Sequence, residues 1–517
     1  MSGYDYCILG TILLYLVGMV AIGAVLSKQN KNTDDFYLGG RKLGPLVTAM
    51  SAEASDMSSW LLMGMPGLAL MCGLPEASWT AIGLAIGTYL NWLFVARRIR
   101  LYSHRIGAVT LPDFFAKRFG DKGNLLTVIS AVFIIVFFIP YTASGFSACG
   151  KLFSSLFGID YTLAMVLSAA VIAIYCTLGG FLAASTTDFV QSIIMTVALF
   201  VVIGLGEGLV HGFQNVFANV QGMTGYLNLF KGFDVAAGKT TSYGALPVAS
   251  TLAWGLGYFG MPHILLRFMA IEDDRKLKTS RRVATVWVVI SMAVAVLIGV
   301  VGYSLMKTGI LPAYADNSAA ETVIVDISKF LSSFGYIPAV VAGVILAGIL
   351  ASTMSTADSQ LLAAASSISQ NLVQETFKVK MSRKASMWLA RISVLAISVV
   401  AVFLALDPSS SVFRIVSFAW AGFGAAFGPV VLFALFWKRT NKWGALAGMV
   451  SGGVMVFVWK FLVRPACAGT LLDIYELLPA FLIACVFIVV VSLCTKAPEQ
   501  EITGVYNEVQ QSVKQKA

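Results

Sequence analysis

Ser51-Ala52-Glu53-Ala54-Ser55-Asp56-Met57-Ser58-Ser59-Trp60 lies in the middle of an apolar segment that extends from residue 43 to residue 72. The segment is long enough to cross a bilayer, yet its centre holds two carboxylates and four serine hydroxyls. A carboxylate at that depth costs about 3 kcal/mol and normally faces a partner or a wet cavity. Serine and aspartate also compete with a helix for backbone hydrogen bonds, which favours a local break.

A break at this point would direct backbone carbonyls and hydroxyls into the membrane interior. Such hard oxygen ligands suit a hard cation. The alternative is an unbroken helix whose serines bond to their own carbonyls and whose Asp56 pairs with a basic residue elsewhere. The density of polar groups favours an ion or substrate site.

Composition places the chain among polytopic α-helical membrane proteins. It has 517 residues, of which 58% are hydrophobic and 12% charged, with a mean hydropathy of +0.82. The net charge of +10 does not indicate nucleic acid, because the basic residues fall in short loops between apolar segments. The seven cysteines lack CxxC spacing and predict neither a disulfide frame nor a metal site. The first apolar run lacks a signal-peptide pattern, so we expect it to be retained.

Hydropathy predicts thirteen spans, at 4–27, 43–73, 76–97, 123–150, 160–180, 186–210, 246–272, 282–308, 334–372, 385–406, 411–437, 441–463 and 473–495. With the N-terminus outside, 26 lysines and arginines lie on the inner side and seven on the outer side. This bias predicts a multi-pass protein of the cell membrane with an external N-terminus and a cytoplasmic C-terminus.

The seventh predicted span contains a second interruption. Residues 253–263 bring three glycines, a proline and a histidine to membrane depth. Glycine and proline weaken a helix, and the freed backbone groups need a cavity or a ligand. An alternative is that the glycines only allow close helix packing, but packing does not require the Pro262-His263 pair.

Two interrupted spans, five apart and entering from opposite sides, match the inverted-repeat plan of secondary transporters. We therefore expect an all-α fold with a five-plus-five core. Repeat one would cover 43–210 and repeat two 246–437. Residues 1–42 would form a peripheral helix and inner loop, 438–495 two peripheral helices, and 496–517 a cytoplasmic tail.

The ninth span carries a stripe of hydroxyls. Ser352, Ser355, Thr356 and Ser359 recur at spacings that place them on one helical face. Opposite a broken helix, this stripe could complete an oxygen cage without adding charge. Its alternative is an ordinary small-residue interface whose hydroxyls bond back to their own helix.

Together these stretches resemble the sodium/solute symporter family, and within it the sodium/proline branch. The matching residues extend over nearly the whole chain, namely 35–41, 55–58, 111–115, 179–182, 257–260, 262–264, 354–356 and 418–429. The resemblance implies a core like that of the bacterial leucine transporter. It also implies coupled uptake of Na⁺ and L-proline, with Na⁺ as the coupling ion.

The resemblance also implies roles for particular residues. The Na⁺ ligands would be the carbonyls of Ala54, Met57 and Ser352 and the hydroxyls of Ser355 and Thr356. Asp56, Ser58 and Asp188 would be linked to sodium, with Asp188 on its inner path. Tyr141, Trp254 and Tyr258 would line the proline pocket, and Arg41 and Arg414 match arginines tied to coupling or substrate affinity.

The chain departs from the family pattern at three positions near these sites. Met261 stands where a glutamine is expected before Pro262-His263, and Glu53 and Ser59 replace small residues beside Asp56. The first change removes a polar group near the pocket. The others add polarity near the ion, which leaves coupling to H⁺ or Li⁺ as an alternative.

Proline itself suits the aromatic residues. Its ring can lie among Trp254, Tyr141 and Tyr258, its ammonium over an aromatic face, and its carboxylate at donors of an unwound helix. Alternatives are another amino acid, a monocarboxylate, or a channel or sensor on the same scaffold. An enzyme is disfavoured, because the three histidines lie far apart in sequence and no catalytic motif is present. A monomer in a lipid bilayer would suffice, and the sequence does not indicate the oligomeric state.

Overall fold

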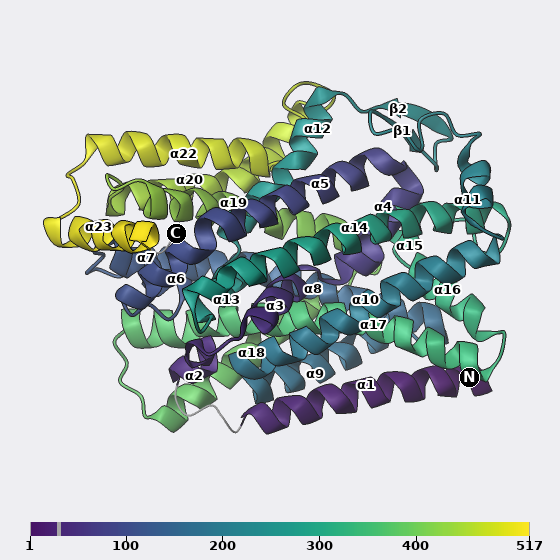
Figure 1. Ribbon diagram of the computed structural model, residues 1–517, viewed down its shortest axis with the longest axis horizontal. Helices are drawn as coiled ribbons and strands as arrows, with labels where there is room; N and C mark the ends of the chain where they lie inside the picture. Colours follow the sequence, from purple (N-terminus) through teal and green to yellow (C-terminus); the bar gives the residue numbers. More distant parts are fainter. Residues whose placement is uncertain (1, 28–32, 516–517) are drawn as a thin grey trace.

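The computed structural model describes residues 2–27 and 33–515. The protein is almost entirely helical, and most of its long helices run nearly parallel to the longest axis of the molecule (Figure 1). The long helices are α1 (Gly3–Ser27), α5 (Leu74–Leu90), α8 (Leu125–Phe157), α9 (Tyr161–Gly179), α10 (Phe181–Leu209), α14 (Leu277–Lys307), α17 (Tyr336–Ser366), α18 (Arg383–Leu404), α19 (Val412–Phe436), α20 (Lys442–Val458) and α22 (Leu477–Cys494).

Several of these helices continue into short turns of different pitch. They are the π-helical turns η3 (Asn91–Val95) after α5, η6 (Ser367–Thr376) after α17 and η7 (Trp459–Val463) after α20. Shorter elements connect the spans: α2 (Thr33–Leu38), η1 (Gly39–Arg41), α6 (Ala96–Arg105), α7 (Leu111–Phe119), α11 (Phe213–Val220), η5 (Asp274–Lys276), α15 (Asn317–Ala320), α16 (Val323–Ser332), α21 (Arg464–Ala466) and α23 (Gln500–Gln515).

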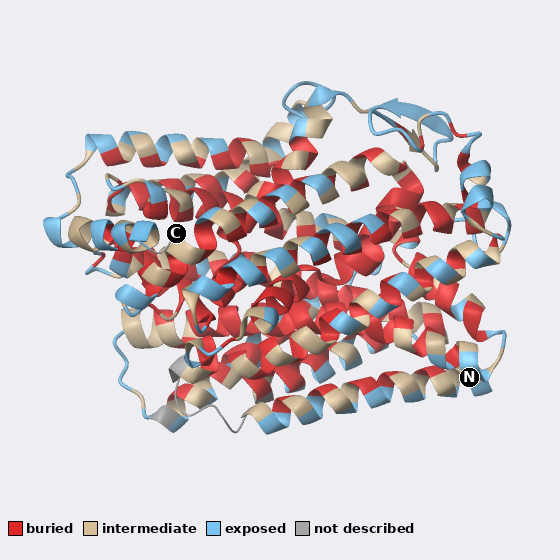
Figure 2. Ribbon diagram, in the orientation of Figure 1, coloured by how far each residue is buried: buried red, intermediate tan, exposed pale blue. Residues whose placement is uncertain are grey.

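Ten helices within the described residues are long and apolar enough to cross a membrane. They correspond to ten of the predicted spans, and the other three are the two interrupted segments and α9, so the count of thirteen stays a prediction. Buried residues fill the middle of the bundle, whereas its outer helices carry exposed apolar side chains (Figure 2). Leu14 on α1 and Val486 on α22 are 75% and 59% exposed. Such side chains suit a lipid surface and would be unusual facing water.

The first interruption occurs where the sequence predicts it. The helix α3 (Pro45–Asp56) ends at Met57, whose φ of −76° and ψ of 66° are those of an inverse γ-turn. The Ser58 N–H accordingly donates to the Asp56 carbonyl at 2.8 Å. The chain then resumes as a π-helical turn, η2 (Trp60–Gly64), and as α4 (Met65–Cys72).

The second interruption is also confirmed. After α12 (Ala245–Leu252), the chain forms a 3₁₀ helix, η4 (Ala253–Gly260), becomes extended at Met261 and continues as α13 (Pro262–Ala270). The packing explanation for the glycines also holds, because a Cβ on Gly257 would lie 2.0 Å from Nε1 of Trp420. A Cβ on Gly255 would likewise lie 2.2 Å from the carbonyl oxygen of Gly83 on α5. The glycines therefore serve both the break and the close approach of neighbouring helices.

The two broken segments face each other inside the bundle. Helix α3 packs against α13, α10, α14 and α17, and η4 packs against α5 and α19. At the end of the bundle that carries α13's last residues, the Leu43 N–H donates to the Ala270 carbonyl at 3.2 Å. This arrangement surrounds the residues near position 57 with helices on every side.

The bundle has two ends, which we name by their distinctive elements. The hairpin face carries α1's first residues, α11, α15 and a two-stranded antiparallel sheet of β1 (Lys231–Asp234) and β2 (Lys239–Ser242), in which Lys231 pairs with Ser242 (Figure 1). The tail face carries α6, α7 and the C-terminal helix α23. The first residues of α1 and the helix α23 thus lie on opposite faces. Lys28, Lys31 and Lys516, three of the basic residues counted on the inner side, lie outside the described residues.

A candidate cation and substrate site between two broken helices

The hydroxyl stripe of α17 contacts the end of α3. The Ser355 hydroxyl donates to the Ala54 carbonyl at 2.8 Å and lies 3.2 Å from the Ser352 carbonyl. The Thr356 hydroxyl lies 3.1 Å from that same Ser352 carbonyl. Four of the five oxygens predicted to bind Na⁺ are therefore already linked by hydrogen bonds.

Met57 provides the fifth predicted oxygen. Because its ψ is not helical, its carbonyl turns out of the α3 hydrogen-bond ladder while its N–H still donates to the Glu53 carbonyl at 2.8 Å. All five residues are buried; the most accessible, Thr356, is 3% exposed. Carbonyls and hydroxyls without a formal charge are suitable ligands for a hard monovalent cation.

The alternative explanation for the stripe also applies in part. The hydroxyls of Ser352 and Ser359 bond back to the carbonyls of Ile349 and Ser355, at 2.8 and 3.0 Å. Only Ser355 reaches across to α3. The stripe thus contains one hydroxyl that donates across to α3 and others that donate to carbonyls of their own helix.

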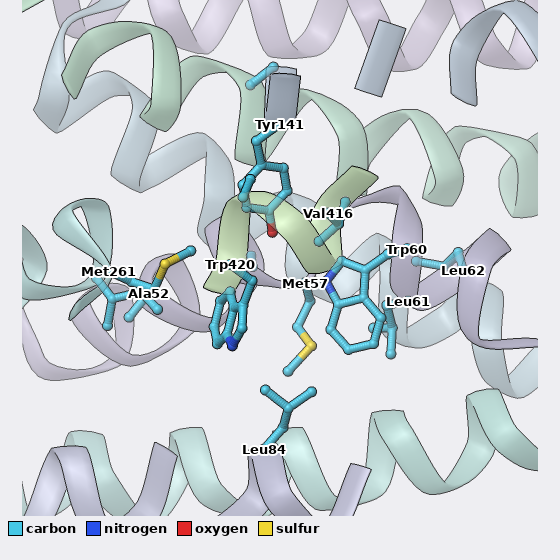
Figure 3. Packing of buried hydrophobic residues seen from close by; sticks show 14 of the residues in the cluster. Ala52, Met57, Trp60, Leu61, Leu62, Leu84, Tyr141, Met261, Val416 and Trp420 are labelled. Atoms are coloured by element: carbon cyan, nitrogen blue, oxygen red, sulfur yellow. The ribbon is translucent and has the colours of Figure 1, made fainter. Parts of the chain in front are cut away.

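Asp56 joins the break to three aromatic side chains. Its backbone carbonyl accepts hydrogen bonds from the Tyr141 hydroxyl and the Trp60 indole, both at 3.2 Å. Its carboxylate Oδ2 accepts from the Tyr258 hydroxyl at 2.6 Å, and within the described residues Oδ1 has no hydrogen-bond partner. Figure 3 shows the rings of Tyr141, Trp60 and Trp420 gathered around the side chain of Met57.

Trp254 completes this aromatic group toward the hairpin face. Its backbone carbonyl accepts from the Trp420 indole at 2.8 Å, and its ring lies 6.1 Å from that of Trp60. Tyr475, in the segment before α22, stacks on Trp254 at 5.2 Å and 18°. The predicted pocket residues Tyr141, Trp254 and Tyr258 therefore lie in one buried aromatic group. The sequence did not predict that Trp60, Trp420 and Tyr475 belong to this group.

An ion-paired cluster lies beside this group, between α3, α10, α13 and α17. Asp188 Oδ2 lies 2.9 Å from the Arg267 guanidinium and accepts from the Ser51 hydroxyl at 2.7 Å. Arg267 also donates to Ser51 and Ser359, so one guanidinium connects four helices. Both members of the ion pair are at most 1% exposed.

Neither Arg267 nor Asp358, which lies beside this cluster on α17, was predicted from the sequence to have a role. Asp358 Oδ1 accepts from the Ser359 hydroxyl at 3.1 Å, and Oδ2 has no partner among the described residues. Both residues are charged side chains within predicted spans. A search for every charged residue at membrane depth would have singled them out.

Within the described residues, neither Glu53 nor Ser59 makes a side-chain hydrogen bond to α17. Glu53 is directed toward α5 and η3, where one carboxylate oxygen accepts from the Thr88 hydroxyl and the Trp92 indole, each at 2.8 Å. The Ser59 hydroxyl is buried and has no partner within the described residues. Ser58 instead stays at the break, where its hydroxyl accepts from the Trp60 N–H at 3.4 Å.

Met261 and His263 lie at the second break. Met261 is the extended residue between η4 and α13 and is fully buried. The His263 ring packs 5.6 Å from the ring of Phe138, and neither ring nitrogen has a partner among the described residues.

The two remaining arginines lie at opposite ends of the bundle. Arg41, at the tail face, donates to the Met269 carbonyl at 2.6 Å and to the Ala108 carbonyl at 2.5 Å. Arg414 lies in the first turn of α19 and lines a cavity at the hairpin face. The structure therefore brings neither arginine into contact with the oxygens around Ser355.

A sequence model of the sodium:solute symporter family matches residues 36–452. The chain belongs to the sodium:solute symporter family. Members of this family couple solute movement to sodium and are transporters, not enzymes. Sodium is accordingly the coupling ion, and the chain is a multi-pass membrane protein.

Several curated members of the family are similar over nearly their whole length. The sodium/proline symporter of Haemophilus influenzae is 41% identical over 100% of both chains. The sodium/proline symporter of Escherichia coli is 41% identical, over 94% of this chain and 93% of its own. The osmoregulated proline transporter OpuE of Bacillus subtilis is 40% identical, over 97% of this chain and 98% of its own.

A solved structure shows the same fold. A substrate-bound, outward-open Na⁺-coupled sialic acid symporter superposes with a TM-score of 0.75 over 96% of this chain and 99% of its own, at 17% identity. At that identity the likeness establishes the fold alone. The family member described here therefore has the predicted leucine-transporter-like architecture.

Proposed function

We propose that this family member carries L-proline into the cell together with Na⁺ by alternating access. The observation that carries the proposal is the hydrogen bond from Ser355 to the Ala54 carbonyl. It joins α17 to the broken helix two residues before Asp56, around which the aromatic residues gather. Support for proline as the solute comes from the curated relatives that are about 40% identical over nearly the whole chain.

Na⁺ would bind to the carbonyls of Ala54, Met57 and Ser352 and to the hydroxyls of Ser355 and Thr356. The ion would replace the Ser355–Ala54 hydrogen bond with contacts from both oxygens to the same cation. Because these ligands come from α3 and α17, bound Na⁺ would hold the two helices in one relative position. This ligand set carries no formal charge, so the ion brings a positive charge next to the carboxylate of Asp56.

Proline would bind among Tyr141, Trp254 and Tyr258. The rings offer apolar area to the pyrrolidine ring, and their faces attract its ammonium group. The break at Met261 leaves the first N–H groups of α13 without a capping side chain, so they are available to a carboxylate. His263 and Met261 at this break are then candidates for determining which amino acids are accepted.

Sodium and proline binding are linked in this arrangement because both depend on the geometry of residues 54–58. If Na⁺ raises the affinity for proline by a given factor, proline raises the affinity for Na⁺ by the same factor. The driving force is adequate. About 100 mV of membrane potential contributes roughly 2.3 kcal/mol per charge, and a tenfold Na⁺ gradient adds about 1.4 kcal/mol. One ion could therefore support roughly 500-fold accumulation.

The Asp188–Arg267 pair would close the route from this site to the tail face. It ties α10 to α13, and its hydroxyl contacts extend to α3 and α17. A path that releases Na⁺ past Asp188 requires these bonds to separate. Arg41 would act at a distance from the site, since it holds the ends of α6 and α13 together at the same face.

We propose the tail face as the cytoplasmic side of the cell membrane and the hairpin face as the outer side, on the charge bias of the loops. Residues 43–210 and 246–437 form the two repeats, with 1–42 and 438–495 peripheral and 496–517 cytoplasmic. Each repeat then begins with one of the two interrupted segments. Since all ligands come from one chain, a monomer suffices.

Uptake of radiolabelled proline into proteoliposomes tests the transport proposal. An inward Na⁺ gradient should drive accumulation well above equilibrium, whereas equal uptake with and without the gradient would refute sodium coupling. Competition by other amino acids and monocarboxylates separates proline from alternative solutes. Gradients of Li⁺ or H⁺ in place of Na⁺ test the alternative coupling ions.

Trp254→Ala tests the aromatic pocket. Removing the indole eliminates the ring that contacts Trp60, Trp420 and Tyr475. We expect proline affinity at saturating Na⁺ to fall by about tenfold or more, because a buried aromatic contributes several kcal/mol. Trp443→Ala, at an exposed position on α20, is the matched control. Unchanged proline affinity in Trp254→Ala would remove this residue from the site.

A further inference from the structure

An open groove of about 480 Å³ lies where α3, α10 and α14 pack against one another. Met50 of α3 and Trp287 of α14 are buried at its base, and Phe200 of α10 is 50% exposed at its edge. The Trp287 indole donates to the Thr196 hydroxyl at 2.8 Å, and that hydroxyl donates to the Ser192 carbonyl at 2.7 Å. Because these polar atoms are satisfied, the base of the groove presents apolar surface.

One stripe of α14 changes from basic to apolar along this groove. Lys278, Arg282, Val286 and Ile290 follow one another at four-residue spacing, which keeps neighbouring members on one side of the helix. Helix α14 runs from the tail face, where η5 contacts α6, to the hairpin face, where it contacts α11. The basic members are therefore nearest the tail face. Arg282, Val286 and Ile290 line the groove, and the two apolar members are 59% and 42% exposed.

The basic members of this stripe differ from the other basic residues at the start of α14. Arg275 and Lys276 are held in ion pairs by nearby carboxylates, at 2.7 and 2.6 Å. The Arg281 guanidinium lies over an aromatic ring of α5, at 5.5 Å from its centre. Lys278 and Arg282 are exposed, and among the described residues neither makes an ion pair or a side-chain hydrogen bond. The groove thus has two uncommitted positive charges at its tail-face end.

We propose that this groove binds an anionic phospholipid. The headgroup phosphate would lie at Arg282, whose planar fork of donors matches phosphate oxygens, and Lys278 would add a second positive charge. An acyl chain would lie along Val286 and Ile290 and against the Trp287 ring. Basic pockets between membrane helices commonly hold anionic headgroups in this way. A zwitterionic lipid offers the same chains, but its own cation opposes the two basic side chains. The inference does not depend on which solute is transported.

The groove is connected to the ion-paired cluster through one turn of α3. Met50, at the base of the groove, directly precedes Ser51, whose hydroxyl contacts both Asp188 and Arg267. A lipid in the groove would contact α3, α10 and α14 at once. It would therefore favour the arrangement in which these three helices are packed together. The lipid would belong to the leaflet at the tail face, which is cytoplasmic in the orientation proposed above.

Quenching of Trp287 by brominated phospholipids tests the site in the full-length protein reconstituted into phosphatidylcholine vesicles. The bromine atoms are placed on the acyl chains of added phosphatidylglycerol or, for comparison, of phosphatidylcholine. Trp287→Phe, made in the wild type and in each charge variant, gives the quenching of this one indole by difference. Since a basic residue near a membrane surface favours an anionic lipid by about fivefold, the wild type should prefer phosphatidylglycerol beside Trp287 by about 25-fold.

Charge variants identify the headgroup position. Arg282→Gln should lower the preference to about fivefold, and adding Lys278→Gln should abolish it. Arg281→Gln is the matched control, because it removes the same charge one residue away, from the side of α14 that faces α5. It should keep the wild-type preference. Equal losses in Arg281→Gln and Arg282→Gln would overturn the site, since general surface charge would then explain the preference.

Two results in the wild type would also overturn the proposal. Equal quenching of Trp287 by both lipids would show that the groove accepts any acyl chain. Absence of quenching by either lipid would show that no lipid reaches the groove, as when a second copy of the chain covers it.

Thermal unfolding in detergent provides a second readout, because a ligand that binds only the folded state raises the unfolding midpoint. Added phosphatidylglycerol should raise the midpoints of the wild type and Arg281→Gln more than phosphatidylcholine does. In the variant carrying both Lys278→Gln and Arg282→Gln, the two lipids should have equal effects. A phosphatidylglycerol shift that persists undiminished in this double variant would contradict the proposed headgroup position.

Discussion

Ser355→Ala is the substitution that separates a cation ligand from an ordinary helix-packing serine. The Ser355 hydroxyl is the one member of the α17 stripe that reaches across to α3, where it lies 2.8 Å from the Ala54 carbonyl. Ser352→Ala is its matched control on the same face. The Ser352 hydroxyl bonds back to the Ile349 carbonyl at 2.8 Å, so only its backbone carbonyl is a proposed ligand.

The expected magnitudes differ sharply between the two variants. An interaction of a hydroxyl with a charged group contributes about 1.5–3 kcal/mol, so losing it from the cation site should weaken Na⁺ binding by roughly 10- to 150-fold. Loss of the Ser352 hydroxyl removes a bond that is present with and without Na⁺. An interaction that is equally strong in the Na⁺-free and Na⁺-bound states does not change the free energy of Na⁺ binding. The Na⁺ affinity of Ser352→Ala should therefore change by less than about twofold.

The assay is a Na⁺ titration of proline binding to purified protein, followed by a proline titration at saturating Na⁺. Ser355→Ala should shift the Na⁺ midpoint strongly and leave the saturating-Na⁺ proline affinity nearly unchanged. Equal effects of Ser352→Ala and Ser355→Ala would refute the distinction between the two hydroxyls. A loss of proline affinity at saturating Na⁺ would instead assign Ser355 to the substrate pocket.

Two further substitutions test how the broken helices are held. Gly257→Ala places a Cβ 2.0 Å from Nε1 of Trp420 and should lower the free energy of unfolding by about 1–3 kcal/mol or more. The control Gly10→Ala, whose Cβ would have nothing within 4 Å, should leave that free energy unchanged. Equal thermal unfolding midpoints for the two variants would contradict the close approach of Gly257 to Trp420. Arg267→Met leaves the Asp188 carboxylate buried without its cation and should cost about 3–5 kcal/mol, measured by thermal unfolding in detergent. Adding Asp188→Asn to Arg267→Met should recover more than half of that loss, and a double variant no more stable than the single one would show that the ion pair is not the reason for the instability.

The two helix breaks could be predicted because their causes are local. The run of serines and aspartate before Met57, and the glycines before Pro262, weaken the helix whatever surrounds them. The hydroxyl stripe could be predicted from helical spacing alone. Spacing could not show which hydroxyl donates across to α3, since Ser355 does so while Ser352 and Ser359 donate to carbonyls within α17.

Side-chain contacts between segments that are distant in the sequence could not be predicted from it. Glu53 precedes the break by only a few residues, yet the helix turns it toward Thr88 and Trp92 and away from the α17 oxygens. Arg267 and Asp188 are 79 positions apart, and nothing in either local sequence indicates the partner. Tyr475 reaches Trp254 from the segment before α22, a helix that the repeat pattern treats as peripheral. These contacts depend on how helices are arranged in space, which hydropathy and helical periodicity do not specify.

In the proposed mechanism, two interrupted helices bind Na⁺ and an amino acid at one shared geometry. Isothermal titration of the purified protein measures this most directly, with proline titrated at zero and at saturating Na⁺ and Na⁺ titrated at zero and at saturating proline. We expect each ligand to raise the affinity for the other, and by the same factor. A proline affinity that is identical with and without Na⁺ would contradict it.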